Sequence, residues 1–251
     1  MIIIYRLFTF LLLPFILLTL LYRLKINKED RARISERLGK TKHLRPNGPI
    51  IWIHCASVGE SLSTLSLVNK IVADYQNIHV LITTGTITAA KILSKKIPER
   101  TIHQYVPVDL TIAVRRFLKF WKPSLALWIE SELWPNLVTE TQKTQAPMIL
   151  LNGRVSEKSY RIWKIFPNFI RKLLSSFEIC LGQSNAEEEK LKSLGAKNVT
   201  YAGNLKFGAK KLPLDEKQYQ SLKNDLKDRT IWLAASTHPH EEKIIGSIHS
   251  K

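Results

Sequence analysis

Glu60 stands where a carboxylate could act as a general base. It ends the segment 50–60, in which an apolar, strand-like run leads through small residues into a helical pattern over 61–74. Small residues such as Ser57 and Gly59 let a ligand approach the backbone, and the amides of a helix start attract anions. A carboxylate at the carboxyl end of a sheet strand is well placed to take a proton from a substrate. The same position is equally consistent with a glutamate that only caps its helix.

Polar residues also follow the other predicted strands. Thr84 and Thr86 lie in a hydroxyl-rich turn that could hold a phosphate or a sugar, or could simply cap the next helix. Asp109 follows the third strand, and its simplest interpretation is the N-cap of the helix after it. Arg154 follows the fifth strand and is a candidate for binding an anionic group of a substrate.

The loop after the fourth predicted strand, Glu130–Asn136, is unusually rich in chemistry. It holds two carboxylates, Glu130 and Glu132, together with a tryptophan and a proline, which is more than a turn needs to fold. Glu132 could also be a plain first-turn acid. The Glu130-x-Glu132 pair could in principle hold a cation, although Mg²⁺ sites depend on substrate phosphates as well.

These loops belong to a repeated alternation of strands and helices, which favours a parallel, doubly wound α/β sheet covered on both faces. The predicted strands are 50–53, 78–83, 102–105, 125–129, 148–151, 178–181 and 199–201. The predicted helices are 61–74, 86–96, 110–120, 133–141, 163–175 and 184–193. Ligands should bind at the loops that follow the strands.

Residues 1–22 are almost entirely apolar and are just long enough to span a bilayer. Basic residues follow in 23–48 in place of a cleavage site, which predicts a single uncleaved anchor with the rest of the chain on the cytoplasmic side. Arg6 and Pro14 leave a helix lying in the membrane interface as an alternative. The helical stretch 31–37 could bind anionic headgroups beside an anchor, but by itself we interpret it as a solvated charge run.

The composition indicates an anionic partner. The chain of 251 residues has 38 Lys and Arg against 21 Asp and Glu, a net charge of +17. Nucleic acid and acidic lipid are the two candidates. No nucleic-acid-binding motif is present, and the predicted anchor favours lipid. The two cysteines give no disulfide framework and no cysteine-rich metal site.

The organisation changes beyond residue 203. We expect one Rossmann-like domain over 49–203, a linker and helix over 204–229, with the helix near 215–226, and the start of a second α/β unit over 230–251. This last part should contain a strand at 231–235. A lone strand and helix cannot bury a core of their own, so only the beginning of a second domain is expected.

Together these motifs resemble one family, the 3-deoxy-D-manno-octulosonic acid (Kdo) transferases that act on the lipid A precursor in Gram-negative bacteria. The matching stretches occur in family order: 54–60, 84–88, 107–109, 130–136, Asn152 with Arg154, 195–198, 203–207 and 236–239. The resemblance implies a GT-B glycosyltransferase, in which the N-terminal domain binds the acceptor and a second domain binds the CMP-Kdo donor. It also implies an inverting reaction without metal or other cofactor.

The resemblance further implies roles for particular residues. Glu60 would remove the proton from a glucosamine hydroxyl of a bisphosphorylated glycolipid, and that oxygen would attack the anomeric carbon of Kdo as CMP departs. Glu130 and Lys206 match positions that stabilise the transition state. The implied substrate-binding residues are Ser57, Gly59, Thr84, Thr86, Glu132, Asn136 and Arg154, and those of a donor-side loop are Ser236, Thr237 and His238.

Two functional predictions stay open. Gly208 and Ala235 depart mildly from the family pattern, and the chain ends at Lys251, before the family's donor-binding motifs. The first prediction is a Kdo transferase seen as its N-terminal piece, which could work with a separately encoded C-terminal half. The second is a non-catalytic, membrane-anchored, lipid-binding remnant. The expected partners are CMP-Kdo, the lipid A precursor and anionic lipids of the inner membrane, with no nucleic acid.

Overall fold

The structure, a computed structural model, divides into two compact units, Met1–Lys210 and Lys211–Lys251. The residues that it describes are 1–130, 132–208 and 214–249. Residues 209–213 of the predicted linker, residues 250–251 of the predicted second domain and Ser131 lie outside this description.

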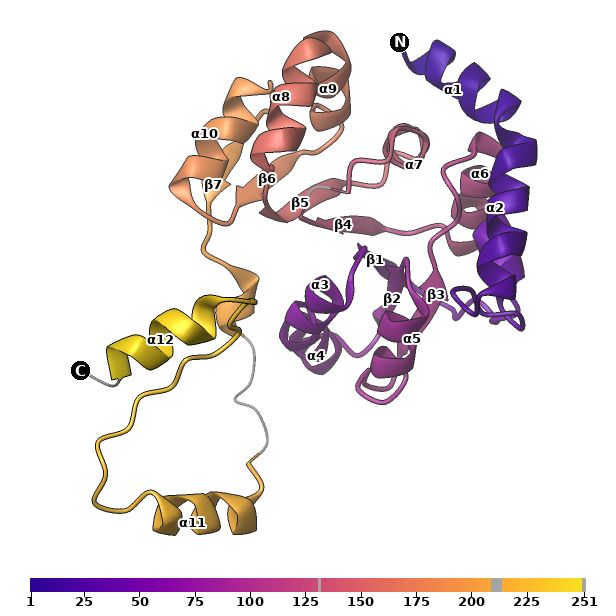
Figure 1. Ribbon diagram of the computed structural model, residues 1–251. Helices are drawn as coiled ribbons and strands as arrows, with labels where there is room; N and C mark the ends of the chain where they lie inside the picture. Colours follow the sequence, from indigo (N-terminus) through magenta and orange to yellow (C-terminus); the bar gives the residue numbers. More distant parts are fainter. Residues whose placement is uncertain (131, 209–213, 250–251) are drawn as a thin grey trace. The chain divides into compact units, whose positions relative to one another are not determined.

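The first unit is built on a parallel sheet of seven strands in the order β3-β2-β1-β4-β5-β6-β7 (Figure 1). The strands are β1 Ile50–His54, β2 His79–Thr84, β3 Thr101–Tyr105, β4 Leu125–Ile129, β5 Met148–Gly153, β6 Ile179–Gly182 and β7 Val199–Tyr201. The strand order reverses between β1 and β4, and open α/β sheets bind ligands in the crevice beyond such a switch point. The predicted α/β class and all seven predicted strands are confirmed.

Helices connect the strands. They are α3 Val58–Ser63, α4 Leu65–Asp74, α5 Ile87–Leu93, α6 Thr111–Trp121, α7 Pro135–Gln142, α8 Glu157–Ile165, α9 Pro167–Leu174 and α10 Asn185–Ser193. The predicted helix 61–74 begins earlier, at Val58, and is interrupted at Thr64. The predicted helix 163–175 is two helices, because Pro167 has no amide hydrogen with which to continue α8 and starts α9 instead.

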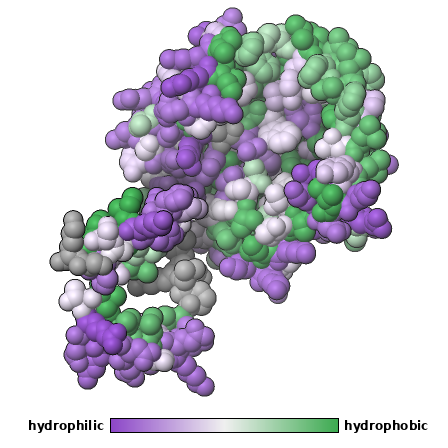
Figure 2. Space-filling view, viewed as in Figure 1, coloured by the Kyte–Doolittle hydropathy of each residue, from purple (hydrophilic) through white to green (hydrophobic). Residues whose placement is uncertain are grey.

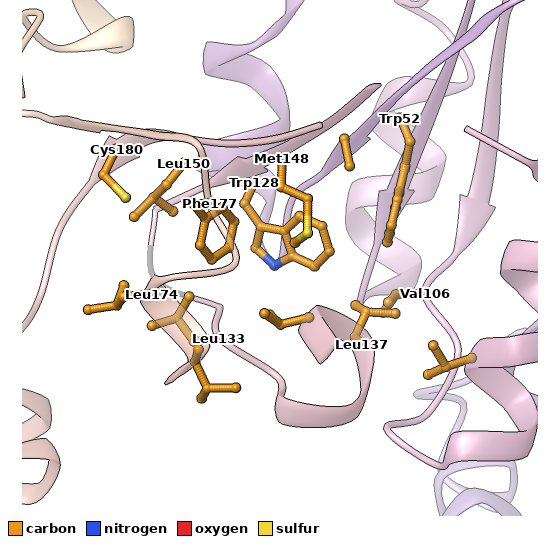
Figure 3. Close-up of a cluster of buried hydrophobic side chains, with 14 of the residues drawn as sticks. Trp52, Val106, Trp128, Leu133, Leu137, Met148, Leu150, Leu174, Phe177 and Cys180 are labelled. Carbon is orange, nitrogen blue, oxygen red and sulfur yellow. The ribbon is translucent and has the colours of Figure 1, made fainter. Parts of the chain in front are cut away.

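Large aromatic side chains fill the core on one side of the sheet. Trp52 and Trp128, from neighbouring strands, are fully buried and meet edge to face with ring centroids 4.8 Å apart. Phe177 packs against Trp128 at 5.7 Å (Figure 3). A second cluster of buried side chains includes Ile53 and Ile82. Because both faces of the sheet are buried, the sequences of these strands are continuous apolar runs.

The apolar N-terminus is a bent pair of helices, α1 Ile2–Leu11 and α2 Leu13–Lys25, rather than one. The two axes differ by 58°, and Pro14 lies in the first turn of α2, where proline is tolerated. Among the described residues, no helix alone has the length and apolar character to cross a bilayer, whereas this pair together has both.

Polar side chains attach α1 to the rest of the first unit. The hydroxyl of Tyr5 donates to Oδ2 of Asp109 at 2.8 Å. Arg6 donates to Oε1 of Glu140 at 2.5 Å and to the hydroxyl of Thr139. The inward face of α1 is therefore polar and bonded to the loop before α6 and to α7.

The basic stretch after α2 is packed, so its interpretation as a solvated charge run is wrong. It forms a short 3₁₀ helix, η1 Ile34–Leu38. Arg37 is only 6% exposed and donates to both carboxylate oxygens of Glu29 and to the carbonyl of Val106. Arg33 pairs with Glu36 and donates to the carbonyl of His103. Buried carboxylates hold these guanidinium groups inside, because a buried charge needs a partner.

The second unit contains the helices α11 Glu216–Asp225 and α12 Glu241–His249. The first confirms the predicted helix near 215–226. The predicted strand at 231–235 is wrong: these residues form no strand in the described part of this unit. An extended segment needs a neighbouring strand for its backbone hydrogen bonds, and the sheet lies in the other unit.

Candidate active site

Glu60 lies in the first turn of α3, directly beyond β1. Ser57 is the N-cap of α3: its Oγ accepts a hydrogen bond from the amide of Glu60 at 3.3 Å and donates one to Glu60 Oε1 at 2.8 Å. The amide of Ala56 donates to Oε2 at 2.7 Å. These reciprocal bonds resemble a capping box, so the capping interpretation is confirmed. The role of Glu60 as a base stays a prediction.

The surroundings of Glu60 favour its protonated form. Burial raises the pKa of its carboxyl, and the negative charges of Glu130 and Glu132 raise it further. The hydrogen bonds from Ala56 and Ser57 lower it, and the net shift is upward from the ordinary value of 4.5. A carboxylate with a raised pKa is a stronger base for taking a proton near neutral pH.

Glu130 and Lys206 form an ion pair near Glu60. Nζ of Lys206 lies 3.3 Å from Oε1 of Glu130, which follows β4. Lys206 belongs to a short 3₁₀ helix, η2 Leu205–Gly208, which contacts α3. The backbone of Glu130 is left-handed, with φ of 58°. This costs a residue other than glycine about 1 kcal/mol or more, and such strain is often found at functional sites.

Asn152, in β5, positions η2. Its Oδ1 accepts a hydrogen bond from the amide of Leu205 at 3.2 Å, next to Lys206. Asn152 is 2% exposed and has a φ of 54°, a conformation that asparagine adopts more readily than most residues. Asn152 belongs to a stretch that matches the family, but no role was predicted for it. The signal in the sequence for such a role was a polar asparagine at the end of an apolar strand.

The residues predicted to bind substrate after β1 and β2 differ in accessibility. Gly59 faces open space, since a Cβ added there would meet no atom within 4 Å. Thr86 is the N-cap of α5 and accepts a hydrogen bond from the amide of Ala89 at 3.2 Å. Thr84 is fully buried and bonds to Nε2 of His103 at 2.8 Å. Thr86 and Gly59 can therefore meet a ligand more readily than Thr84.

Asp109 caps a helix, but not the predicted one. The N-cap of α6 is Leu110, so Asp109 lies one residue too early to cap it. Its carboxylate instead accepts hydrogen bonds from the amides of Asn136 at 3.1 Å and Leu137 at 2.8 Å, at the start of α7. Asn136 is fully buried, and its Nδ2 donates to the carbonyl of Asp109 at 2.6 Å. Asn136 therefore helps to hold the start of α7 against Asp109. Its role in substrate binding stays a prediction.

Glu132 is held by two tryptophans. Its carbonyl accepts a hydrogen bond from the indole of Trp128 at 3.0 Å, and its Oε2 accepts one from the indole of Trp134 at 2.6 Å. Trp134 is 39% exposed although it is large and apolar. Within the described ranges, no group of three or more His, Cys, Asp or Glu side chains is placed to hold a metal ion.

Arg154 and the three residues of the predicted donor-side loop complete the predicted set. Arg154 is exposed, one residue beyond the end of β5. Ser236, Thr237 and His238 belong to the second unit, ahead of α12. The hydroxyl of Thr237 donates to Glu242 at 2.9 Å, and the amide of His238 donates to Glu241 at 2.8 Å.

A parallel α/β sheet with helices between its strands defines the first unit as a Rossmann-like domain, and Glu60 lies at the switch point of that sheet. The family model described as 3-deoxy-D-manno-octulosonic-acid transferase (kdotransferase) matches residues 32–209. The chain therefore belongs to the Kdo transferase family.

Relatives agree with this assignment. The chain is 41% identical to a 3-deoxy-D-manno-octulosonic acid transferase of Rickettsia bellii, over 96% of this chain and 57% of that protein. It is 31% identical to a probable mitochondrial 3-deoxy-D-manno-octulosonic acid transferase of Arabidopsis thaliana, over 98% of this chain and 57% of the relative. The chain thus spans 57% of the length of each.

Among solved structures, the chain is similar to the UDP-GlcNAc 2-epimerase of Neisseria meningitidis bound to UDP-GlcNAc. The sequences are 12% identical, and the match covers 71% of this chain and 53% of the other with a TM-score of 0.48. A likeness at that level carries no argument about function.

Proposed function

We propose that this chain is the acceptor-binding part of a Kdo transferase of lipopolysaccharide biosynthesis, in which Kdo passes from CMP-Kdo to the lipid A precursor. Family membership supports the reaction class. The observation that carries the assignment to this unit is Glu60, a buried carboxylate of raised pKa close to the Glu130–Lys206 pair.

In the proposed reaction, Glu60 removes a proton from the acceptor hydroxyl. The resulting oxygen attacks the anomeric carbon of Kdo, and the bond to the CMP phosphate breaks with inversion. The two oxygens of Glu60 are not equivalent: Oε2 is held by the backbone amide of Ala56, whereas Oε1 is held by the Ser57 hydroxyl, which can rotate away. We therefore assign the proton to Oε1, where the acceptor hydroxyl would replace that of Ser57.

Lys206 would stabilise the departing phosphate. A positioned ammonium group acts on charge that develops in the transition state without any need to reorganise. Glu130 holds this group at 3.3 Å, which favours an orienting role for Glu130 over direct contact with the sugar. Arg154, Thr86 and Gly59 are proposed to bind the acceptor around this centre.

We place the protein on the cytoplasmic face of the inner membrane, held by α1 and α2. Their outward side chains support this, because many large apolar residues are more than half exposed. They are Met1, Ile3, Ile4, Leu7, Phe8, Phe10, Leu11, Phe15, Leu18, Leu21 and Tyr22. Figure 2 shows hydrophobic side chains on the side of the first unit where Figure 1 places these helices. The polar contacts of Tyr5 and Arg6 with the first unit favour a pair of helices lying in the interface over a spanning anchor.

The test is Kdo transfer from CMP-Kdo to the tetraacylated lipid A precursor by membranes that contain this chain. Glu60→Gln should abolish transfer. Glu187→Gln is the matched control, because Glu187 also follows a serine N-cap, Ser184, and is buried at 9% exposure against 7% for Glu60. Transfer that survives in Glu60→Gln would refute the base.

The same assay separates the enzyme from a lipid-binding remnant. A chain that binds the lipid without transfer, even with a separately supplied C-terminal half, would support the remnant. Transfer that appears only when that half is added would support a split enzyme.

A further inference from the structure

A groove of about 480 Å³ runs between α2 and the loops that follow β1, β2 and β3. Phe15, Ile16 and Leu20 form its wall on α2, and Ala56, Val106 and Trp134 line it opposite. Its volume falls within the range of ligand pockets in proteins. We propose that this groove holds one fatty acyl chain of the glycolipid acceptor, a step that rests on the proposed function.

The groove reaches the proposed base. Its lining residue Ala56 donates the amide hydrogen bond that holds Oε2 of Glu60. Trp134, which also lines it, donates to the carboxylate of Glu132 through its indole nitrogen. An apolar chain in the groove would therefore lie beside the residues that receive the sugar. This also gives a role to the exposed tryptophan of the 130–136 segment.

Charge pairing in the groove favours a hydrocarbon over an anion. Three charged residues line it, Arg23, Glu29 and Arg37. Glu29 accepts from Arg23 at 2.8 Å and from Arg37 at 3.0 Å, so these charges satisfy one another. A phosphate would have to displace Glu29 from both guanidinium groups, whereas a methylene chain displaces no ion pair. The phosphorylated sugars thus belong outside the groove.

Continuity with the outer face of α2 identifies the occupant. Phe15 lines the groove and is 66% exposed, and Leu18 on the same helix is 61% exposed. A helix that contacts lipid with one face and borders the groove with another gives an acyl chain a continuous apolar path from the bilayer. A lipid whose headgroup carries the reacting hydroxyl would be drawn toward Glu60 along that path.

The test measures binding of the complete chain to soluble bisphosphorylated glucosamine disaccharides that carry hexanoyl, octanoyl or decanoyl chains. Each buried methylene should tighten binding about fourfold. Ile16→Trp places a large ring in the groove and should remove this dependence on chain length. Leu17→Trp makes a similar change on the same helix away from the groove lining and should retain it. An unchanged dependence in Ile16→Trp would overturn the proposal.

Two further ligands separate this proposal from the proposed function. If the deacylated disaccharide binds and added chains bring no gain, the groove assignment fails while the acceptor site stands. If neither the disaccharide nor its acylated forms bind, both fail. A phospholipid with the same chains that competes equally would make the groove a general lipid site and overturn its assignment to the acceptor.

Discussion

At the scale of single residues, the same local motif occurs twice in this chain, with different side chains around it. Ser57 with Glu60 and Ser184 with Glu187 both begin helices with the serine as N-cap. Glu187 accepts from the amide of Val155 and pairs with Lys190, whereas Glu60 lies near two other carboxylates. The motif can be read from the sequence, but the direction of the pKa shift cannot, because it depends on burial and on Glu130 and Glu132, which follow another strand.

Removal of the Ser57 hydroxyl should therefore raise the pKa of Glu60. Ser57→Ala loses a hydrogen bond that stabilises the charged carboxylate, and it also loses a helix cap that contributes about 1 kcal/mol. Carbon NMR of the glutamate carboxyls would follow the titration of Glu60. Urea unfolding would measure the free energy of unfolding. Ser184→Ala should cost similar stability and leave the Glu60 titration in place. An unmoved Glu60 titration in Ser57→Ala would contradict the cause assigned here.

Acid should destabilise the first unit through two buried histidines. Burial lowers the pKa of His54 and of His103 from 6.5 to about 3, with Arg33 adding to the effect at His103. The unfolded chain takes up these protons below pH 6.5 and the folded chain does not, so stability is lost as the pH falls from 6.5 toward 3. Each histidine contributes up to about 1.4 kcal/mol per pH unit. Urea unfolding should show a shallower pH slope for His54→Gln, and an equal slope would refute the assignment.

At the scale of elements, contacts distant in sequence hold the site loops together. Asp109 joins α1 to α7, since its carboxylate accepts from Tyr5 and from two amides of α7. Strand positions were predictable because apolar runs are local. The partner of Asp109 was not, because a cap on a helix that begins 27 to 28 residues away leaves no local pattern. The break at Pro167 was visible in the sequence. Most of α8 was not predicted, and none of its residues is fully buried.

Tyr5→Phe should weaken the attachment of α1. It removes one hydrogen bond to Asp109 and should cost about 1 kcal/mol in the free energy of unfolding. Hydrogen exchange should speed up at the first amides of α7, whose partner is the same carboxylate. Tyr22→Phe, at a tyrosine that is 62% exposed, is the control and should have little effect. Equal losses in both variants would count against the role of Asp109.

At the scale of the whole molecule, charge and apolar surface act together. The net charge of +17 accompanies the exposed apolar side chains of α1 and α2, a combination that suits an anionic bilayer. Composition alone left nucleic acid and acidic lipid as the candidate partners, and the apolar N-terminus favoured lipid. The inward bonds of α1 could not be predicted, because their partners Asp109 and Glu140 lie 104 and 134 residues away in the sequence.

Vesicle binding should depend on both features. We expect tighter binding to anionic than to neutral vesicles, with weaker binding as salt rises. Leu18→Ser should weaken binding about tenfold through lost apolar contact. Leu44→Ser, at a leucine that is 90% exposed outside the helix pair, should leave it unchanged. Equal effects of the two substitutions, measured by co-sedimentation, would refute attachment through α2.

The burial of Arg37 has a consequence for substrate choice. Its bonds to Glu29 and to the carbonyl of Val106 fasten the segment after α2 to the strand ends. This segment is therefore a rigid connection rather than a flexible linker. On a bilayer, such a rigid connection would fix the height of Glu60 above the lipid surface. With the proposed placement, we expect only a hydroxyl at that height to be reached, so that part of the specificity would come from the distance to the bilayer surface rather than from contacts with the sugar. Lengthening or shortening the acceptor headgroup by one sugar would put its hydroxyl out of register even if every contact to the first sugars were kept.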